Sequence, residues 1–173
     1  PQHQDRQPGL ETEMTPTPES DSPRTGKAGK LTGKVALITG GDSGIGRAVA
    51  IAFAKEGADV AIVYLNEEQD ARETQRLVEE AGRDCIGIAL DIGDEGACRQ
   101  AVDTTLERFG RLDILVNNAG IYMENKVFTE DGIETTFAVN ALAPFLLTQL
   151  LLPRLKSVAK SRVITVSSNS HYR

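Results

Sequence analysis

The chain has 173 residues, of which 40% are hydrophobic and 25% charged, with a formal net charge of −6. This length allows one domain with a substantial core and is too short for two large ones. Nucleic acids and anionic membrane surfaces are bound by clustered positive charge. The acidic balance, with no Lys/Arg cluster, therefore argues against both as partners.

The cysteines and histidines are few and scattered. Cys85 and Cys98 are the two thiols, and His3 and His171 lie near opposite ends. Two thiols without a signal-peptide pattern predict no disulfide framework and a cytoplasmic location. The lack of Cys and His at ligand spacing predicts no metal site. The most apolar stretch, residues 141–152, is about half as long as a membrane span, so we expect a buried helix there and no membrane span.

The first 30 residues differ in composition from the rest. Five of the seven prolines fall within the first 23 residues, among polar side chains. Such a segment buries too little apolar surface to offset its ordering entropy. We therefore expect a disordered Pro-rich tail over residues 1–30 and a folded domain over residues 31–173.

From residue 31 onward, short apolar runs alternate with longer stretches of helical period. Nearly continuous apolar runs predict strands buried on both faces, at residues 35–39, 60–64, 85–90, 114–116 and 163–166. The stretches between and after them predict helices at residues 44–56, 67–81, 94–109 and 132–156. This regular alternation with right-handed crossovers predicts an α/β fold, a doubly wound parallel sheet.

The first predicted strand runs through Gly40, Gly44 and Gly46 directly into a helix. Glycines let backbone N–H groups approach a ligand, and the positive end of the helix dipole favours an anion. A plain turn is the alternative, but a buried strand before the glycines and a helix after them favour a phosphate cradle.

The segment Thr39-Gly-x-x-x-Gly44-x-Gly46 resembles the signature of the short-chain dehydrogenase/reductase family. Matching motifs follow in order: Asp91-Ile92, Asn117-Asn118-Ala119-Gly120, Asn140 and Val166-Ser167-Ser168. The resemblance implies a Rossmann-like domain that is incomplete at its C-terminal side. It also implies an NAD(P)-dependent oxidoreductase that transfers a hydride between the nicotinamide and a small alcohol or carbonyl substrate.

Two subgroups of that family are visible. The tail with residues 31–40 and 64–68 resembles bacterial aldehyde-reductase-type members with long N-terminal extensions. Residues 131–140 and 161–168 are more similar to retinol-dehydrogenase-like members. Because the two parts resemble different subgroups, the sequence does not identify the substrate class.

The resemblance places a nucleotide at the carboxyl ends of the strands. Asp91 is expected to hydrogen-bond the adenine, and its alternative role is to cap the helix that begins near residue 94. Residues 118–120 are expected to line the adenosine side and brace the strands. The expected cofactor-binding residues are Gly40, Ser43, Gly44, Ile45, Gly46, Tyr64, Asn66, Asp91, Ile92, Asn118, Ala119 and Gly120.

The end of the second predicted strand bears on the choice of dinucleotide. An acid there favours NAD, and a nearby Arg favours NADP. Tyr64 and Asn66 are neither, although Glu67 and Glu68 come just after. Arg47 either turns toward a 2′-phosphate or is a solvated surface charge. The pattern permits NAD(H) and NADP(H), with a preference for NADP(H).

The resemblance also implies a catalytic Ser, Asn, Tyr and Lys. Ser168 matches the Ser that polarises the substrate oxygen, and Asn140 matches the Asn that supports a proton-relay water. Ser167 competes with Ser168, and strand alternation places the two on opposite faces; the alternative is that both cap the following turn. Pro144 predicts a kink that frees the Asn140 carbonyl.

The expected Tyr-x-x-x-Lys pair on the helix after the last strand is not found, because the sequence ends at Arg173, five residues past Ser168. Tyr172 is too close to Ser168, and Tyr122 lies in the loop after the fourth strand. We expect an N-terminal part of an oxidoreductase, inactive by itself, whose full-length form is a homo-oligomer. The alternative is a non-catalytic dinucleotide-binding or regulatory protein; an unrelated α/β domain such as a methyltransferase is remote.

Overall fold

The computed structural model describes residue 16 and residues 29–168, so nearly all of the expected tail lies outside the described residues. The elements are β1 (Val35–Thr39), α1 (Gly44–Lys55), β2 (Asp59–Tyr64), α2 (Glu68–Glu80), β3 (Cys85–Ala89), α3 (Glu95–Phe109), β4 (Ile114–Asn117), α4 (Thr135–Phe137), the π-helix η2 (Ala138–Leu142), α5 (Ala143–Ser157) and β5 (Arg162–Thr165). Apart from the last helix, each predicted element is confirmed with its ends moved by no more than one residue.

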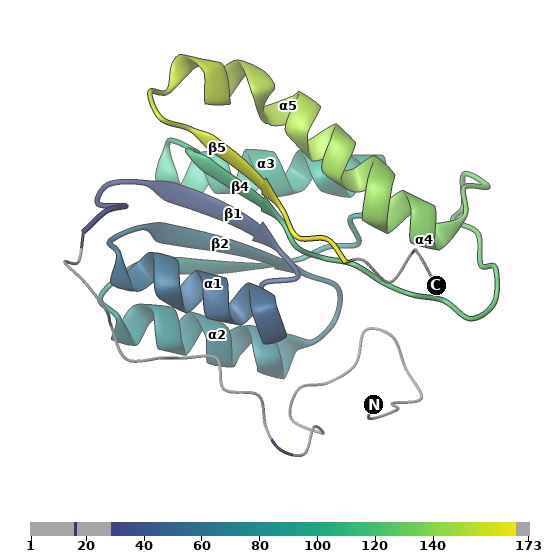
Figure 1. Ribbon diagram of the computed structural model, residues 1–173, viewed down its shortest axis with the longest axis horizontal. Helices are drawn as coiled ribbons and strands as arrows, with labels where there is room; N and C mark the ends of the chain where they lie inside the picture. Colours follow the sequence, from purple (N-terminus) through teal and green to yellow (C-terminus); the bar gives the residue numbers. More distant parts are fainter. Residues whose placement is uncertain (1–15, 17–28, 169–173) are drawn as a thin grey trace.

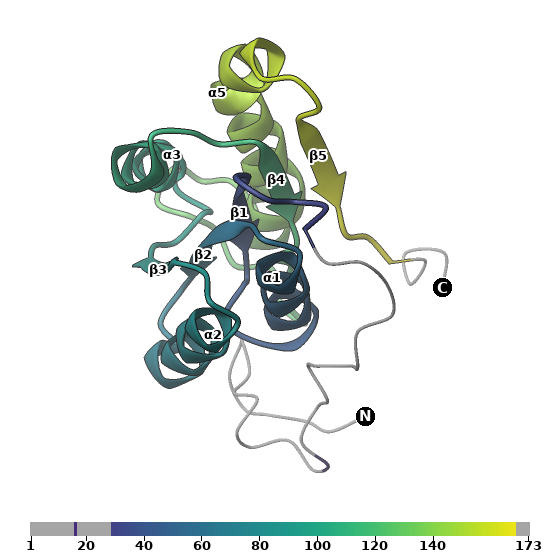
Figure 2. The ribbon, with the colours of Figure 1, turned by 90° about the vertical axis from the view of Figure 1, so that its left-hand side faces the viewer.

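The strands form one parallel sheet in the order β3-β2-β1-β4-β5. Helices α1 and α2 cover one face of the sheet, and α3 and α5 cover the other (Figures 1 and 2). The predicted doubly wound sheet is therefore confirmed. Because the chain reverses its winding direction between β1 and β4, the carboxyl ends of these strands form a switch point, where such folds bind ligands.

The core has an apolar layer on each face of the sheet. β1 is buried at all five positions. Successive side chains of a strand point to opposite faces. Ala36 and Ile38 belong to the layer under α1 and α2, and Leu37 belongs to the layer under α3 and α5. Burial on both faces explains why four of the five residues of β1, all but Thr39, are apolar.

β5 departs from the prediction, since it is exposed at all four positions. Val163 and Ile164 are 42% and 41% exposed. The expectation of burial on both faces is wrong here because β5 is an edge strand of the described sheet; β3, at the other edge, is also only partly buried. Ser167 and Ser168 lie past the end of β5, so strand alternation does not determine which way each points.

The helical segment before β5 starts at Thr135 rather than at residue 132 and changes to π geometry over Ala138–Leu142. Pro144 has no N–H to donate to the Asn140 carbonyl, and its ring crowds that oxygen. The expected local distortion therefore takes the form of a π-bulge.

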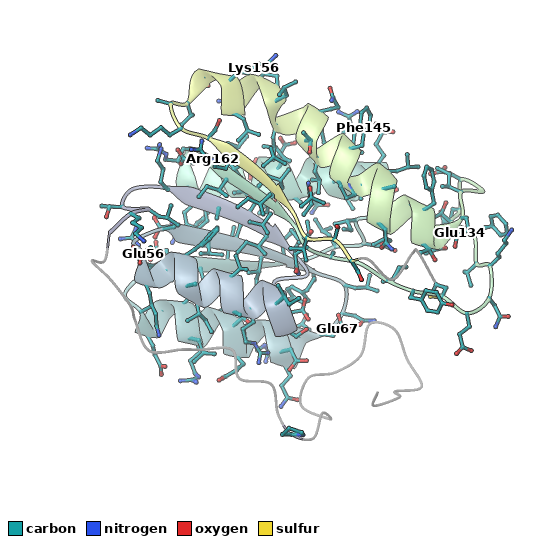
Figure 3. The ribbon with its side chains drawn as sticks, in the orientation of Figure 1. Glu56, Glu67, Glu134, Phe145, Lys156 and Arg162 are labelled. Atoms are coloured by element: carbon teal, nitrogen blue, oxygen red, sulfur yellow. The ribbon has the colours of Figure 1, made fainter. Side chains whose placement is uncertain are left out.

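The segment Thr135–Ser157 is the one helix among the described residues that is long and apolar enough to cross a membrane; its most apolar window of 18 residues has a mean hydropathy of 1.5, and 28% of that window is buried. The expectation that the apolar stretch is too short to span a membrane thus holds for residues 141–152 but not for the whole helix. In this fold Leu147 and Leu151 are fully buried, and Phe145, on the outer side of α5, is 63% exposed (Figure 3).

Candidate functional site

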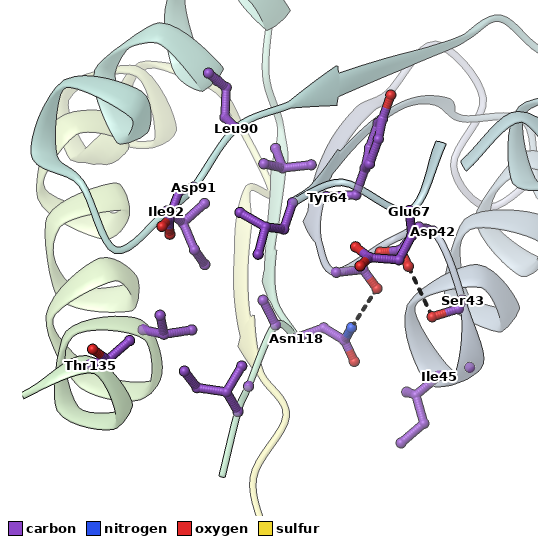
Figure 4. A pocket seen from close by; sticks show the side chains of 18 of the residues that line it. Asp42, Ser43, Ile45, Tyr64, Glu67, Leu90, Asp91, Ile92, Asn118 and Thr135 are labelled. Atoms are coloured by element: carbon purple, nitrogen blue, oxygen red, sulfur yellow. Dashed lines mark hydrogen bonds between the residues drawn. The ribbon is translucent and has the colours of Figure 1, made fainter. Parts of the chain in front are cut away.

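A cavity of about 400 Å³ lies at the carboxyl ends of the strands (Figure 4). This volume is within the range of small-molecule and cofactor sites. Ten of the twelve expected cofactor-binding residues line it, and Gly46 and Asn66 do not. The full lining is Gly40, Asp42, Ser43, Gly44, Ile45, Val63, Tyr64, Leu65, Glu67, Leu90, Asp91, Ile92, Asn118, Ala119, Gly120, Ile121, Met123, Thr135 and Val139.

The glycines of the loop after β1 are required for separate reasons. Gly40 and Gly44 have φ of +61° and +51°, a region that other residues rarely adopt. A Cβ on Gly46 would lie 1.9 Å from the Gly40 carbonyl oxygen. Gly41, which sequence reasoning missed, has no room because its Cβ would lie 2.5 Å from Cγ2 of Ile62. Glycine at these four positions lets α1 start tight against β1.

Both neighbouring strands hold this loop. The Gly40 N–H donates to the Val63 carbonyl at the end of β2, at 2.7 Å. From the β4 side, Nδ2 of Asn118 donates to the carbonyls of Thr39 and Gly40, at 3.0 and 2.9 Å. Oγ1 of Thr39 accepts the N–H groups of Asn118 and Ala119, at 3.1 and 3.0 Å. The loop is therefore fixed before any ligand binds.

The N-terminus of α1 can accept an anion. Its N-cap, Ser43, makes no side-chain cap hydrogen bond, and no acid stands in the first turn. Instead, the Ser43 hydroxyl donates to Oδ2 of Asp42, at 3.0 Å. The first N–H groups of a helix have no intrahelical acceptor, and the dipole adds positive potential there. Ser43, Gly44 and Ile45 line the cavity, so this end of the helix is open to it.

Arg47 fits neither of its two expected roles. It is only 7% exposed and does not line the cavity. Its Nε and Nη2 donate to the Asp42 carbonyl, at 3.0 and 2.7 Å, and Nη2 lies 3.5 Å from Oδ1 of Asp70. Because α2 packs against α1 and brings Asp70 to it, Arg47 is neither solvated nor turned toward the cavity.

Three acidic residues line the cavity, Asp42, Glu67 and Asp91, and the first two are buried. Asp42 and Glu67 are 6% and 2% exposed. Figure 4 shows them together beside Tyr64, with Asp91 and Ile92 across the cavity. Burial raises the pKa of Asp42, and the neighbouring charges of Glu67 and Asp70 act in the same direction.

Glu67 was expected to stand beyond the site. Its Oε2 instead accepts the Asn66 N–H at 3.1 Å, and its side chain lines the cavity while Asn66 is exposed outside it. The expectation that no acid stands with Tyr64 and Asn66 at the end of β2 is therefore wrong for the cavity, because the turn into α2 folds Glu67 back into its lining. Sequence spacing carries no signal for that turn.

On the opposite wall of the cavity, the contacts of Asp91 decide whether it caps α3. Oδ1 of Asp91 accepts the Gly93 N–H at 2.8 Å. The cap of α3 is Asp94, whose Oδ1 accepts the Ala97 N–H at 2.7 Å. Capping by Asp91 is therefore wrong, and its carboxylate lines the cavity.

The two expected catalytic residues lie outside the cavity lining. The Asn140 side chain pairs with the backbone of Ile121, accepting its N–H at 2.9 Å and donating to its carbonyl at 2.8 Å. Asn140 thereby holds the loop after β4. Ser168 is exposed beyond β5.

Lys126 follows Tyr122 at the Tyr-x-x-x-Lys spacing, which the sequence reasoning overlooked. These residues lie in a loop without helix, and Tyr122 is 77% exposed. Side chains four residues apart become neighbours only on a helix. The spacing here does not create the expected pair.

The remaining candidates of the sequence yield no second site. Cys85 and Cys98 are both free and buried. Within residues 29–168, the acids, histidines and cysteines form no group of three or more placed to hold a metal ion. His3 and His171 lie outside the described residues.

Comparison with known proteins finds matches over the same part of the chain that forms this fold. The short chain dehydrogenase family profile matches residues 34–172. The chain belongs to the short-chain dehydrogenase family. It is 51% identical over 159 residues to the uncharacterized oxidoreductase YhdF of Bacillus subtilis, covering 90% of this chain and 55% of YhdF. It is 40% identical to the NADPH-dependent aldehyde reductase 1, chloroplastic, of Arabidopsis thaliana, covering 98% of this chain and 62% of that protein.

The solved structures agree with this family. A short chain dehydrogenase from Burkholderia cenocepacia, in complex with NADP, has a TM-score of 0.75 and 40% identity. That match covers 83% of this chain and 59% of the Burkholderia chain. The chain thus spans somewhat more than half the length of the relatives that it matches.

Proposed function

We propose that residues 31–173 are the cofactor-binding part of an NAD(P)-dependent oxidoreductase. Its reaction is a hydride transfer between the nicotinamide and an alcohol, aldehyde or ketone. The observation that carries the proposal is the glycine loop leading into α1, whose N-terminus opens on a cavity of about 400 Å³ at the switch point. The names of the relatives, an oxidoreductase and an aldehyde reductase, support it.

The lining residues suit the parts of a dinucleotide. The N–H groups of Gly44, Ile45 and Gly46 would donate to the pyrophosphate, because they begin a helix and lack intrahelical acceptors. Asp91 would accept from the adenine amino group beside the apolar Ile92. A Cβ on Gly44 would meet nothing within 4 Å, so this backbone is open to close approach by a phosphate. Ser43, Ala119 and Gly120 complete the walls.

The cofactor proposed is NADP(H), with NAD(H) as a second ligand. The NADP in the Burkholderia structure and the NADPH-dependent aldehyde reductase support the first. Asp42 and Glu67 act against a 2′-phosphate, because like charges repel in a partly buried site. The preference for NADP(H) is therefore expected to be modest, with Tyr64 and Asn66 nearest the ribose edge.

Ser168 is proposed to hold the substrate oxygen, and Asn140 to position a proton-relay water through the loop after β4. Within residues 29–168 no helix brings an acid/base Tyr and its Lys together, so we propose that this part alone binds dinucleotide weakly and catalyses nothing. The whole protein is proposed to be a cytoplasmic homo-oligomer that acts on small molecules, with no nucleic-acid or membrane partner.

The test is NADPH consumption by the complete protein with a panel of aldehydes and ketones. We expect turnover, and Ser168→Ala lowers kcat by about 100-fold or more, the loss typical of an oxyanion donor. Ser167→Ala is the matched control and retains activity. Dinucleotide binding without turnover would favour the non-catalytic alternative, and absence of binding would remove both.

A further inference from the structure

The backbone carbonyl of Asp42, in the middle of the glycine loop, is held by an unusual set of donors. Nε and Nη2 of Arg47 donate to it at 3.0 and 2.7 Å, and Oγ1 of Thr74 donates to it at 2.7 Å. A carbonyl oxygen has two lone pairs, so three donors, two of them on a cation, saturate it. This carbonyl is therefore turned firmly inward, toward α1 and α2.

The donors form one buried unit that spans the two helices. Thr74 is fully buried, and its Oγ1 also accepts from Nε of Arg47 at 2.9 Å. Asp70, 1% exposed, accepts from Nη2 of Arg47 through its carbonyl at 3.1 Å and faces it with Oδ1 at 3.5 Å. A buried guanidinium is costly unless its hydrogen bonds and charge are satisfied. Asp70 and Thr74 satisfy it here, so Arg47 can point at a single loop carbonyl.

The geometry of the peptide bond carries this constraint to the cavity. In a trans peptide the C=O of one residue and the N–H of the next point in opposite directions. Because the Asp42 carbonyl points at Arg47 and Thr74, neither of which lines the cavity, the Ser43 N–H points away from them. Ser43 itself lines the cavity at the start of α1.

We infer that Arg47, Asp70 and Thr74 are positioning residues that turn the Ser43 N–H toward the cavity, where it donates to a phosphate oxygen of the nucleotide. The inference rests on the proposed dinucleotide function. It assigns Arg47 a role through the backbone of the loop rather than a direct contact with the ligand. Adenosine, which has no phosphate, does not depend on this donor.

A pair of buried threonines allows a matched test in the complete protein. Thr74→Val removes one donor to the Asp42 carbonyl. Thr105→Val removes a hydroxyl that donates to the Ala101 carbonyl within its own helix, α3. Both threonines are fully buried. The dissociation constants of ADP and of adenosine are measured by calorimetry for each variant. We expect Thr74→Val to weaken ADP about three- to tenfold, the effect of one hydrogen bond, and to leave adenosine unchanged.

The outcomes separate the roles. Thr105→Val should leave both constants unchanged, and Thr74→Ser, which keeps the hydroxyl, should restore ADP binding. Equal weakening of ADP and adenosine by Thr74→Val would show a merely structural role and overturn the inference, as would ADP binding within twofold of the unaltered protein. If the unaltered protein binds neither ADP nor NADP(H), the proposed function fails first.

Discussion

The close approach of α1 to β1 makes Gly46→Ala a direct perturbation of the phosphate cradle. The new methyl would lie 1.9 Å from the Gly40 carbonyl oxygen and 2.7 Å from Nδ2 of Asn118. The first distance is at least about 1.5 Å short of favourable contact. Helix propensity acts the other way, since Ala is favoured over Gly by about 1 kcal/mol inside a helix. Forcing a methyl into a packed site costs about 1–3 kcal/mol and occasionally more. Because the atom met here is a backbone oxygen, the cost should be at or above the upper end, and the net loss of stability should be about 2 kcal/mol or more.

Binding should suffer more than stability. The methyl must push the loop and the helix N-terminus apart by about 1 Å, and a displacement of this size can cost about 100-fold where groups are positioned on a ligand. We expect calorimetry with NADP(H) to show this loss in a protein that still melts cooperatively.

Gly96→Ala, in the first turn of α3, is the control. Its Cβ would meet only Oδ1 of Asp94, at 3.1 Å, and it does not line the cavity. This variant should keep the affinity of the unaltered protein. Gly46→Ala with affinity within threefold of the unaltered protein, at equal or higher melting temperature, would refute the reasoning.

Three further predictions concern charges and thiols. Burial pushes the pKa of Asp113 upward, but hydrogen bonds from Arg111, Lys34 and the Val35 N–H lower it overall. The stability it contributes is thus present above its unfolded pKa, about 3.9, and is lost as the pH falls through its folded pKa. In urea unfolding, Asp113→Asn should have a lower free energy of unfolding than the unaltered protein at neutral pH, and the difference should vanish in acid. A difference that stays constant with pH would contradict this. Glu67→Gln should raise the affinity for NADP relative to NAD about tenfold, which is about 1.4 kcal/mol. The change relieves repulsion of the 2′-phosphate of NADP and weakens the hydrogen bond to the 2′-hydroxyl of NAD. An unchanged ratio of the two affinities would exclude a role for this carboxylate. Burial raises the pKa of Cys85 to about 12 and of Cys98 to about 11, with nearby acids adding to both, so iodoacetamide should label them only in denaturant, and rapid labelling of the native protein would argue against the packing.

The features that follow from local sterics could be predicted from the sequence. The turn at Gly40, Gly44 and Gly46 combines positive φ and a close approach within seven residues, and its spacing is visible in the sequence. The apolar run of β1 likewise reports burial on both faces. These two features placed the cavity correctly at the end of β1.

The features missed depend on partners distant in the chain. Arg47 is buried because Asp70 and Thr74, 23 and 27 residues away, face it from α2. Gly41 is required by a side chain of β2, and Glu67 enters the cavity through a turn that no spacing marks. β5 has the composition of a buried strand, yet its exposure is set by what lies beside it in the sheet.

The orientation of a bound dinucleotide tests the central claim most directly. A crystal structure of the complete protein with NADP should show pyrophosphate oxygens within hydrogen-bonding distance of the N–H groups at the start of α1, with the adenine beside Asp91. A dinucleotide bound elsewhere, with the N-terminus of α1 facing only solvent, would contradict the account.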